Sequence, residues 1–125
     1  MATVELNKDN LQSTITGNDI VIIDFWAPWC GPCKSFAPIY EKVSDSHDDV
    51  VFGKVNTEDE QELAASFQIR SIPTLMIFRE QIVIFSQAGM LPESALTELI
   101  GKAKELDMEM VKREVAEQQA KQKQG

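Results

Sequence analysis

The sequence predicts a single α/β domain, in which strands and helices alternate along 125 residues. Three observations predict this fold class. Apolar runs of strand length occur at 21–25 and 50–55, and each is followed by a pattern of helical period. Two further strand patterns, at 74–78 and 82–88, precede a last helical pattern that opens at Pro92. Alternating strands and helices build layered α/β structures.

The first half of the chain contains two strand-then-helix pairs. The strand at 21–25 ends in a turn region at 26–29, and a helical pattern then runs from Cys33 to about His47. Pro38 lies inside that helix and should kink it, because its ring removes a backbone donor. The strand at 50–55 is followed by a helical pattern at 60–67. These pairs predict a sheet with helices packed against it.

The second half is predicted to contain a hairpin and a long helix. The connection Arg79-Glu80-Gln81 lacks glycine, which tight two-residue turns favour, so we expect a loose turn. Pro92 suits the first position of a helix, and Leu96, Leu99, Ile100 and Ala103 share one apolar face. A straight helix over 92–121 would be about 45 Å long, against about 20 Å for a strand. It must therefore break or project from the domain.

Composition narrows the possible partners. A net charge of −8 would repel nucleic acid and anionic membranes, so neither is an expected partner. The first residues do not resemble a signal peptide, and no apolar run is long enough to span a membrane. With only two cysteines, the chain does not resemble a secreted disulfide scaffold, so we expect a reducing compartment, the cytoplasm.

The two cysteines, Cys30 and Cys33, lie where the first strand passes into its helix. Side chains three apart meet across one helical turn, so this pair can form a reversible disulfide. A permanent disulfide staple is an alternative, although closing four residues contributes only about 2 kcal/mol. A zinc site is another, but a structural site needs four ligands, and His47 is the only histidine. At a helix N-terminus a thiolate is stabilised, so Cys30 is the candidate nucleophile and Cys33 the resolving thiol.

Three motifs give the chain a specific resemblance. Trp29-Cys30-Gly31-Pro32-Cys33-Lys34, Asp24-Phe25-Trp26-Ala27 and Ile72-Pro73-Thr74 all match the thioredoxin family of bacterial type. The resemblance covers about 4–104. It implies a thioredoxin fold, with a central mixed sheet flanked by helices on both faces and Pro73 in a cis peptide bond. It also implies a protein-disulfide reductase that binds no cofactor and receives electrons from NADPH through a flavin-containing thioredoxin reductase.

The resemblance also implies roles for residues outside the dithiol. From the sequence alone, the favoured interpretation of Asp24 is a strand-end carboxylate near solvent, and that of Pro73 is a strand-start proline. In thioredoxins the acid that matches Asp24 is buried and accepts the proton of the resolving cysteine, and Lys54 matches the lysine near it. Trp26 is expected in the core. The residues that match the surface on which protein substrates dock are Trp29, Gly31, Pro32, Ile72, Pro73, Ala88 and Gly89.

The last part of the chain departs from the family pattern. We expect a thioredoxin domain over 1–105 and a polar helical extension over 106–125. Met108, Val111 and Val115 share one helix face and are expected to pack on the body or to join a second molecule; a frayed tail is the alternative. The rival function is a redox-independent binding subunit or chaperone-like module that uses this tail. The expected state is a monomer, with a tail-mediated dimer as the alternative.

Overall fold

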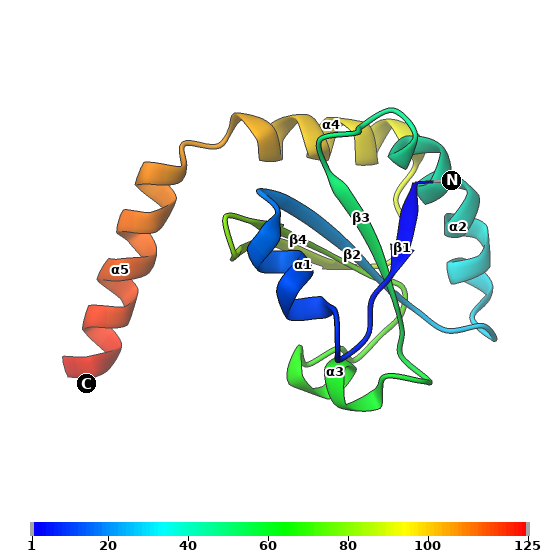
Figure 1. The fold of residues 1–125 in the computed structure, drawn as a ribbon, viewed down its shortest axis with the longest axis horizontal. Coiled ribbons are helices and arrows are strands. Elements are labelled where there is room, and N and C mark those ends of the chain that lie inside the picture. Colours follow the sequence, from blue (N-terminus) through cyan, green and yellow to red (C-terminus); the bar gives the residue numbers. More distant parts are fainter. Residues whose placement is uncertain (1, 125) are drawn as a thin grey trace.

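The computed structural model describes residues 2–124 and contains one five-stranded sheet with the strand order β1-β3-β2-β4-β5 (Figure 1). The strands are β1 (Thr3–Glu5), β2 (Ile20–Trp26), β3 (Val51–Asn56), β4 (Thr74–Arg79) and β5 (Ile82–Ala88). The helices are α1 (Leu11–Gly17), α2 (Gly31–Ser44), α3 (Gln61–Ser66), α4 (Glu93–Glu105) and α5 (Met108–Gln124). The predicted α/β fold with a C-terminal helix is confirmed.

The central strand β2 is buried on both faces, because successive side chains of a strand point to opposite sides. Ile20 and Ile22 join the core that α2 and α4 complete. Val21, Ile23 and Phe25 join the core completed by α1, with Leu63 and Phe67 of the α3 region packed against it. One continuous apolar run therefore holds helices on both faces, which is the layered arrangement of Figure 1.

The pairing of β2 brings distant segments to one end of the sheet. β2 runs parallel to β3, with Trp26 opposite Asn56, and antiparallel to β4, with Phe25 opposite Thr74. The loop after β2, which carries both cysteines, therefore lies beside the loop before β4, which carries Ile72 and Pro73. The strand register thus brings these two loops to the same end of the sheet.

Several boundaries differ from the sequence prediction. The second helix begins at Gly31, two residues before the expected Cys33, and Pro92 is the N-cap of α4 and not its first residue. α2 continues through Pro38 as one helix. β1 and α1 were not predicted, because β1 has only three residues and α1 buries only two apolar side chains, Leu11 and Ile15.

The expectation of a loose β4–β5 turn is wrong. The hairpin closes through Glu80 and Gln81 alone, and both have positive φ, 49° and 71°. This is the conformation of a tight two-residue turn, for which glycine or asparagine is usual. The Glu80 N–H donates to the Asp19 carbonyl at 2.8 Å, which holds the turn against the loop before β2.

The C-terminal helical segment breaks after Glu105. Arg79, at the end of β4, donates from one guanidinium nitrogen to the carbonyls of Ala103, Lys104 and Leu106 at 2.7–3.1 Å. These carbonyls belong to the end of α4, where no further helical N–H reaches them. Asp107 then starts α5, since its Oδ1 accepts from the Glu109 and Met110 N–H groups.

α5 is anchored at its start and projects from the body beyond it (Figure 1). Met108 is buried, and Lys112 forms an ion pair with Glu80 of the hairpin turn. Val111 and Val115, which share the face of Met108, are only half-buried. The start of the extension is therefore in contact with the folded body at Met108 and Lys112.

We expect Arg79→Ala to lower stability by about 2 kcal/mol and the melting temperature by about 5–10 °C. The variant removes three hydrogen bonds from a charged donor and leaves the end of α4 uncapped. Thermal unfolding followed by circular dichroism measures the change, with the exposed Arg70→Ala as the matched control. Equal melting temperatures for both variants would show that Arg79 does not hold the α4–α5 junction.

Candidate functional site

The two cysteines form a disulfide at the N-terminus of α2. Cys30 is the N-cap, its Sγ accepts the Cys33 N–H at 3.2 Å, and the two Cα atoms are 5.2 Å apart. Pro32 occupies the first turn, where its missing N–H costs no hydrogen bond. The partial positive charge of the helix N-terminus therefore lies at Cys30, where it stabilises a thiolate once the disulfide is reduced.

The loop before β4 packs directly on the disulfide. Ala27 and both cysteines form a small buried cluster, against which Trp26 and Ile72 pack. The Cys30 Sγ lies 3.8 Å from the Ile72 carbonyl oxygen, and the bond between Ile72 and Pro73 is cis, as the resemblance implies. Two motifs separated by forty residues thus meet at one point.

The segment after β5 completes this surface. Ala88 pairs with Thr74, and the Gly89 N–H donates to the Pro73 carbonyl at 2.8 Å. Gly89 has φ 99°, a conformation in which a side chain would be strained. This glycine therefore lets the chain leave β5 while it stays bonded to the cis-proline loop.

The expected docking residues differ in exposure. Trp29 is the most exposed large apolar side chain, at 66%, while Ile72 is half-buried and Pro73 buried. The remaining four, Gly31, Pro32, Ala88 and Gly89, are exposed. Met90 is exposed beside Gly89 and was not among the residues expected from sequence. The sequence contains a signal for Met90: it is an apolar residue beside Gly89, in a loop and outside any helical or strand pattern.

Asp24 is a buried carboxylate on β2, the strand that leads into the dithiol loop. It is 1% exposed, and neither carboxylate oxygen has a hydrogen-bond partner among residues 2–124. Loss of hydration raises the pKa of Asp24 from 3.8 to about 7, against a smaller lowering by the positive charge of Lys54. A carboxyl group with a pKa near neutrality can both accept and release a proton under physiological conditions.

Lys54 and Trp26 contact each other, and each also has a neighbour in the site. Lys54 is the Cα partner of Asp24 on β3, and its ammonium lies 4.7 Å from the centre of the Trp26 ring. Thr57 donates to the Trp26 carbonyl from both its N–H and its hydroxyl. Trp26, half-buried, thus contacts the dithiol cluster on one side and the lysine on the other.

Tyr40 is a buried neighbour that the sequence patterns did not single out. Its hydroxyl lies 2.8 Å from the Gly53 carbonyl and 3.1 Å from that of Ile22, so it donates to the β2–β3 pair next to Asp24 and Lys54. Burial, and then the charges of Asp24 and Glu41, raise the pKa of Tyr40 well above its usual range. The phenol therefore stays neutral while Asp24 titrates.

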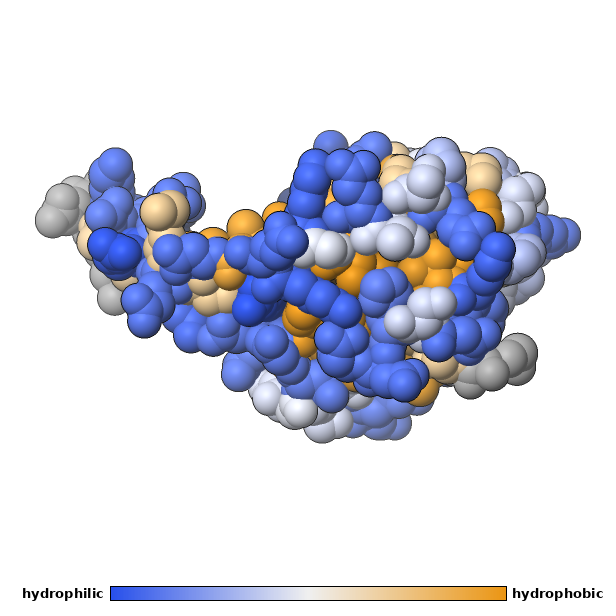
Figure 2. Space-filling model, turned by 90° about the horizontal axis from the view of Figure 1, so that it is seen from above, coloured by the Kyte–Doolittle hydropathy of each residue, from blue (hydrophilic) through white to orange (hydrophobic). Residues whose placement is uncertain are grey.

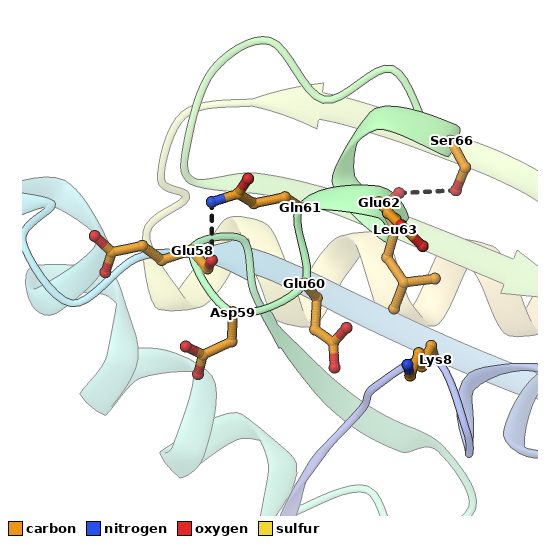
Figure 3. A pocket seen from close by; sticks show the side chains of 8 residues that line it. All are labelled: Lys8, Glu58, Asp59, Glu60, Gln61, Glu62, Leu63 and Ser66. Carbon is orange, nitrogen blue, oxygen red and sulfur yellow. Dashed lines mark hydrogen bonds between the residues drawn. The ribbon is translucent and has the colours of Figure 1, made fainter.

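A surface hollow of about 720 Å³ lies apart from these residues (Figure 3). It is lined by Lys8, Glu58, Asp59, Glu60, Gln61, Glu62, Leu63 and Ser66. Its hydrogen bonds are local: Gln61 donates to the Glu58 carbonyl, and Ser66 to that of Leu63. It is the solvated surface of the acidic turn that leads into α3.

The described part of the chain offers neither a metal-binding cluster nor a membrane-spanning helix. No three histidine, cysteine, aspartate or glutamate residues are grouped there in a way that could hold a metal ion. No helix within residues 2–124 is both long and apolar enough to cross a membrane.

We expect Lys54→Met to raise the pKa of Asp24 further above 7, because the substitution removes the positive charge that now lowers it. The methionine keeps most of the apolar stem that lies against Trp26. Titration of the Asp24 carboxyl by NMR measures the shift, and Lys34→Met, an exposed lysine of α2, is the control. A pKa that does not move would mean that solvent screens Lys54 from the carboxylate.

Comparison with known proteins identifies the family. The Thioredoxin family model matches residues 2–102. A putative thioredoxin 2 of Streptomyces coelicolor is 60% identical over 119 residues, which cover 95% of this chain and 89% of the relative. The thioredoxin of Bacillus subtilis is 38% identical over 82% of this chain and 98% of its own length. The Streptomyces match therefore reaches well into the last 20 residues, where the segment after α4 lies.

Solved structures agree with the sequence matches. A single-site mutant of the thioredoxin from Halobacterium salinarum superposes with a TM-score of 0.76 at 31% identity, covering 83% of this chain and 91% of that one. A Plasmodium falciparum thioredoxin gives a TM-score of 0.73 at 35% identity, over 80% of this chain and 97% of that one. With the Cys30–Cys33 disulfide at the start of α2, these matches show that the chain is a member of the thioredoxin family, a dithiol-disulfide oxidoreductase.

Proposed function

We propose that this thioredoxin reduces disulfides in other proteins, with Cys30 as the attacking thiolate and Cys33 as the resolving thiol. The observation that carries the proposal is the Cys30–Cys33 pair at the N-terminus of α2, where Cys30 alone occupies the N-cap. An anion there receives the helix dipole and the Cys33 N–H, so the Cys30 thiolate forms more readily than the Cys33 thiolate.

The reaction proceeds by two exchanges. The Cys30 thiolate attacks one sulfur of the substrate disulfide, a mixed disulfide forms, and the first substrate thiolate leaves and takes up a proton. Cys33 then gives its proton to the Asp24 carboxylate and attacks the Cys30 sulfur, which releases the second substrate thiolate. The substrate gains two electrons, and the protein is left with the Cys30–Cys33 disulfide.

Other residues position the substrate and the proton. The proposed docking surface consists of Trp29, Gly31, Pro32, Ile72, Pro73, Ala88 and Gly89, and the exposed Met90 follows it in the chain. The Ile72 carbonyl oxygen lies 3.8 Å from the Cys30 Sγ, which supports the proposal that the Ile72 backbone pairs with a substrate strand beside the substrate disulfide. Lys54 adjusts the proton affinity of Asp24.

The oxidised protein must be reduced again. We propose that a flavin-containing thioredoxin reductase, which takes its electrons from NADPH, reduces the Cys30–Cys33 disulfide. We also propose that the protein works in the reducing cytoplasm, which fits a chain with only two cysteines. The test is NADPH oxidation in a mixture of the protein, a bacterial thioredoxin reductase and a protein disulfide. We expect NADPH to be oxidised only when all three components are present. An equal rate of NADPH oxidation without the protein would refute the proposal.

A further inference from the structure

We propose that Tyr40 is a positioning residue for Asp24: its buried hydroxyl joins β2 to β3 beside the Asp24–Lys54 pair and thereby sets the pH at which Asp24 accepts the Cys33 proton. The inference deepens the proposed function and rests on the role of Asp24 as proton acceptor given there. Tyr40 itself neither gives nor takes up the transferred proton.

The Tyr40 hydroxyl joins the two central strands. It lies 3.1 Å from the Ile22 carbonyl oxygen of β2 and 2.8 Å from the Gly53 carbonyl oxygen of β3. A phenol has a single O–H proton, so the two carbonyls share it in a three-centre hydrogen bond. One side chain of α2 therefore holds two strands of the sheet at once.

The strand register places this hydroxyl next to the Asp24–Lys54 pair. Asp24 is the Cα partner of Lys54. The Ile22–Phe52 pair lies two positions earlier, on the same face of the sheet, because side chains alternate along a strand. The Tyr40 ring packs edge-on against Phe52, with ring centroids 5.3 Å apart. The hydroxyl and the carboxylate are therefore neighbours on the face that α2 covers.

The surroundings of Asp24 are poor in polar groups. Neither carboxylate oxygen has a hydrogen-bond partner among residues 2–124. On β4 its Cα partner is the apolar Leu75, and on β3 Lys54 supplies a positive charge. On α2 the titratable groups of the site are Cys33 and Tyr40. Tyr40 is also the only buried member of the described core on this face that has a polar side-chain atom.

The phenol and the carboxylate interact electrostatically. Burial, and then the negative charges of Asp24 and of Glu41 on α2, raise the pKa of Tyr40 above its usual range. Such an interaction acts in both directions, so the dipoles at the Tyr40 hydroxyl also act on the Asp24 carboxylate. Geometry and charge thus agree that the two groups are coupled.

Water does not screen this coupling at the hydroxyl. Tyr40 is fully buried, in the core that Leu96 and Ile100 of α4 complete. Figure 2, which looks onto the α4 side, shows largely hydrophilic side chains, with hydrophobic ones in a band between them. The hydroxyl lies beneath this layer. In such a low-dielectric interior a hydrogen bond and a partial charge have larger effects than in water.

The shared proton favours the ionised form of Asp24. It offsets part of the negative charge on the Ile22 and Gly53 carbonyl oxygens. Without it, both carbonyl oxygens would be less compensated on the face that carries the carboxylate. The carboxylate would then be less stable, and the neutral carboxyl would persist to higher pH.

Tyr40→Phe tests the proposal, because it removes the oxygen and keeps the ring that packs on Phe52. We expect the pKa of the Asp24 carboxyl, titrated by NMR in the disulfide form, to rise from about 7 by at least about 0.5. Ser44→Ala is the matched control. It removes another buried hydroxyl that donates to a carbonyl, that of Glu41 within α2, and should leave the Asp24 titration unchanged.

The pH dependence of substrate release separates positioning from a general loss of structure. In a single turnover at saturating disulfide, we expect release by Tyr40→Phe to be about twofold slower at pH 7, because a smaller fraction of Asp24 is ionised. At pH 9 Asp24 is ionised in both proteins, so the rates should be equal. A general loss of structure would slow release at both pH values.

An Asp24 titration that Tyr40→Phe leaves unchanged, or that Ser44→Ala moves equally, would overturn the proposal. So would release that is slowed as much at pH 9 as at pH 7. A titration that shifts while the pH profile of release does not would overturn the role of Asp24 as proton acceptor, and with it this use of Tyr40, but would leave thiol exchange in place. Failure of the exchange itself would be seen separately, as a wild type that is inactive in the reductase-coupled assay.

Discussion

Cys30→Ser is expected to lower the rate of disulfide reduction by at least about 1,000-fold, to the level of the uncatalysed reaction. A hydroxyl at the N-cap keeps the hydrogen bond from the Cys33 N–H, so the helix and the fold should remain intact. What is lost is the thiolate that attacks the substrate. Reduction of a protein disulfide in the reductase-coupled assay measures the loss, and Ser35→Ala, an exposed neighbour on α2, is the control.

Cys33→Ser should behave differently, because it keeps the attacking thiol. The first exchange occurs, but no second thiol lies beside the Cys30 sulfur to release the substrate, so a covalent complex accumulates. Mass spectrometry of the non-reduced protein after incubation with a disulfide substrate detects it. If Cys30→Ser formed the stable complex instead, with the bond on Cys33, the two roles would have to be exchanged.

Asp24→Asn is expected to stabilise the protein at alkaline pH. The difference in free energy of unfolding between the variant and the wild type should be up to about 4 kcal/mol more favourable to the variant above pH 7 than at pH 4. The reason is the burial of Asp24, which raises the pKa from 3.8 to about 7. An acid with a raised folded-state pKa binds its proton more tightly when folded. Its ionisation therefore opposes folding.

The pH window follows from those two values. Below about pH 4 the carboxyl is protonated in both states and costs nothing. Between about pH 4 and pH 7 the unfolded chain releases its proton while the folded chain keeps it, so the wild type loses stability. Above pH 7 the deficit is constant. Denaturant unfolding of both proteins from pH 4 to pH 9 measures the difference, with Asp59→Asn, an exposed acid, as control.

The same substitution should slow the second exchange. The carboxamide of Asp24→Asn could not accept the Cys33 proton, and we expect turnover at pH 7 to fall about tenfold or more while formation of the mixed disulfide with substrate is less affected. A variant that gains stability with pH but keeps full turnover would separate the two effects. Asp24 would then be a buried charge that destabilises the protein without serving as the proton acceptor.

Local patterns in the sequence were sufficient for much of the fold. The β2 run and the helical period after Cys33 depend on near neighbours along the chain, so they predicted a strand and a helix that the structure confirms. The tight turn at Glu80 was missed, because its support is not local. A carbonyl from Asp19 and an ion pair with Lys112, both distant in sequence, hold two residues at positive φ without glycine.

The extension shows the same limit. The sequence predicted that the extension is helical and that the long helix either breaks or projects. The break itself depends on Arg79, which lies more than twenty residues earlier in the chain. No local sequence pattern predicts that a side chain at the end of a strand will cap a helix that is distant in the chain. Only the packing of α4 against the sheet brings the guanidinium to those carbonyls.

By itself the sequence determined the redox centre, because Cys30 and Cys33 are three residues apart at a strand-to-helix junction and their contact needs only one helical turn. It also determined the α/β class. The tertiary structure decided whether Asp24 was a solvated strand-end acid or a buried one. The β2–β3 register sets Lys54 beside it, and burial on both faces of the sheet removes its hydration. Desolvation depends on every element that covers the carboxylate, and so a pKa of about 7 emerges only from the packed fold.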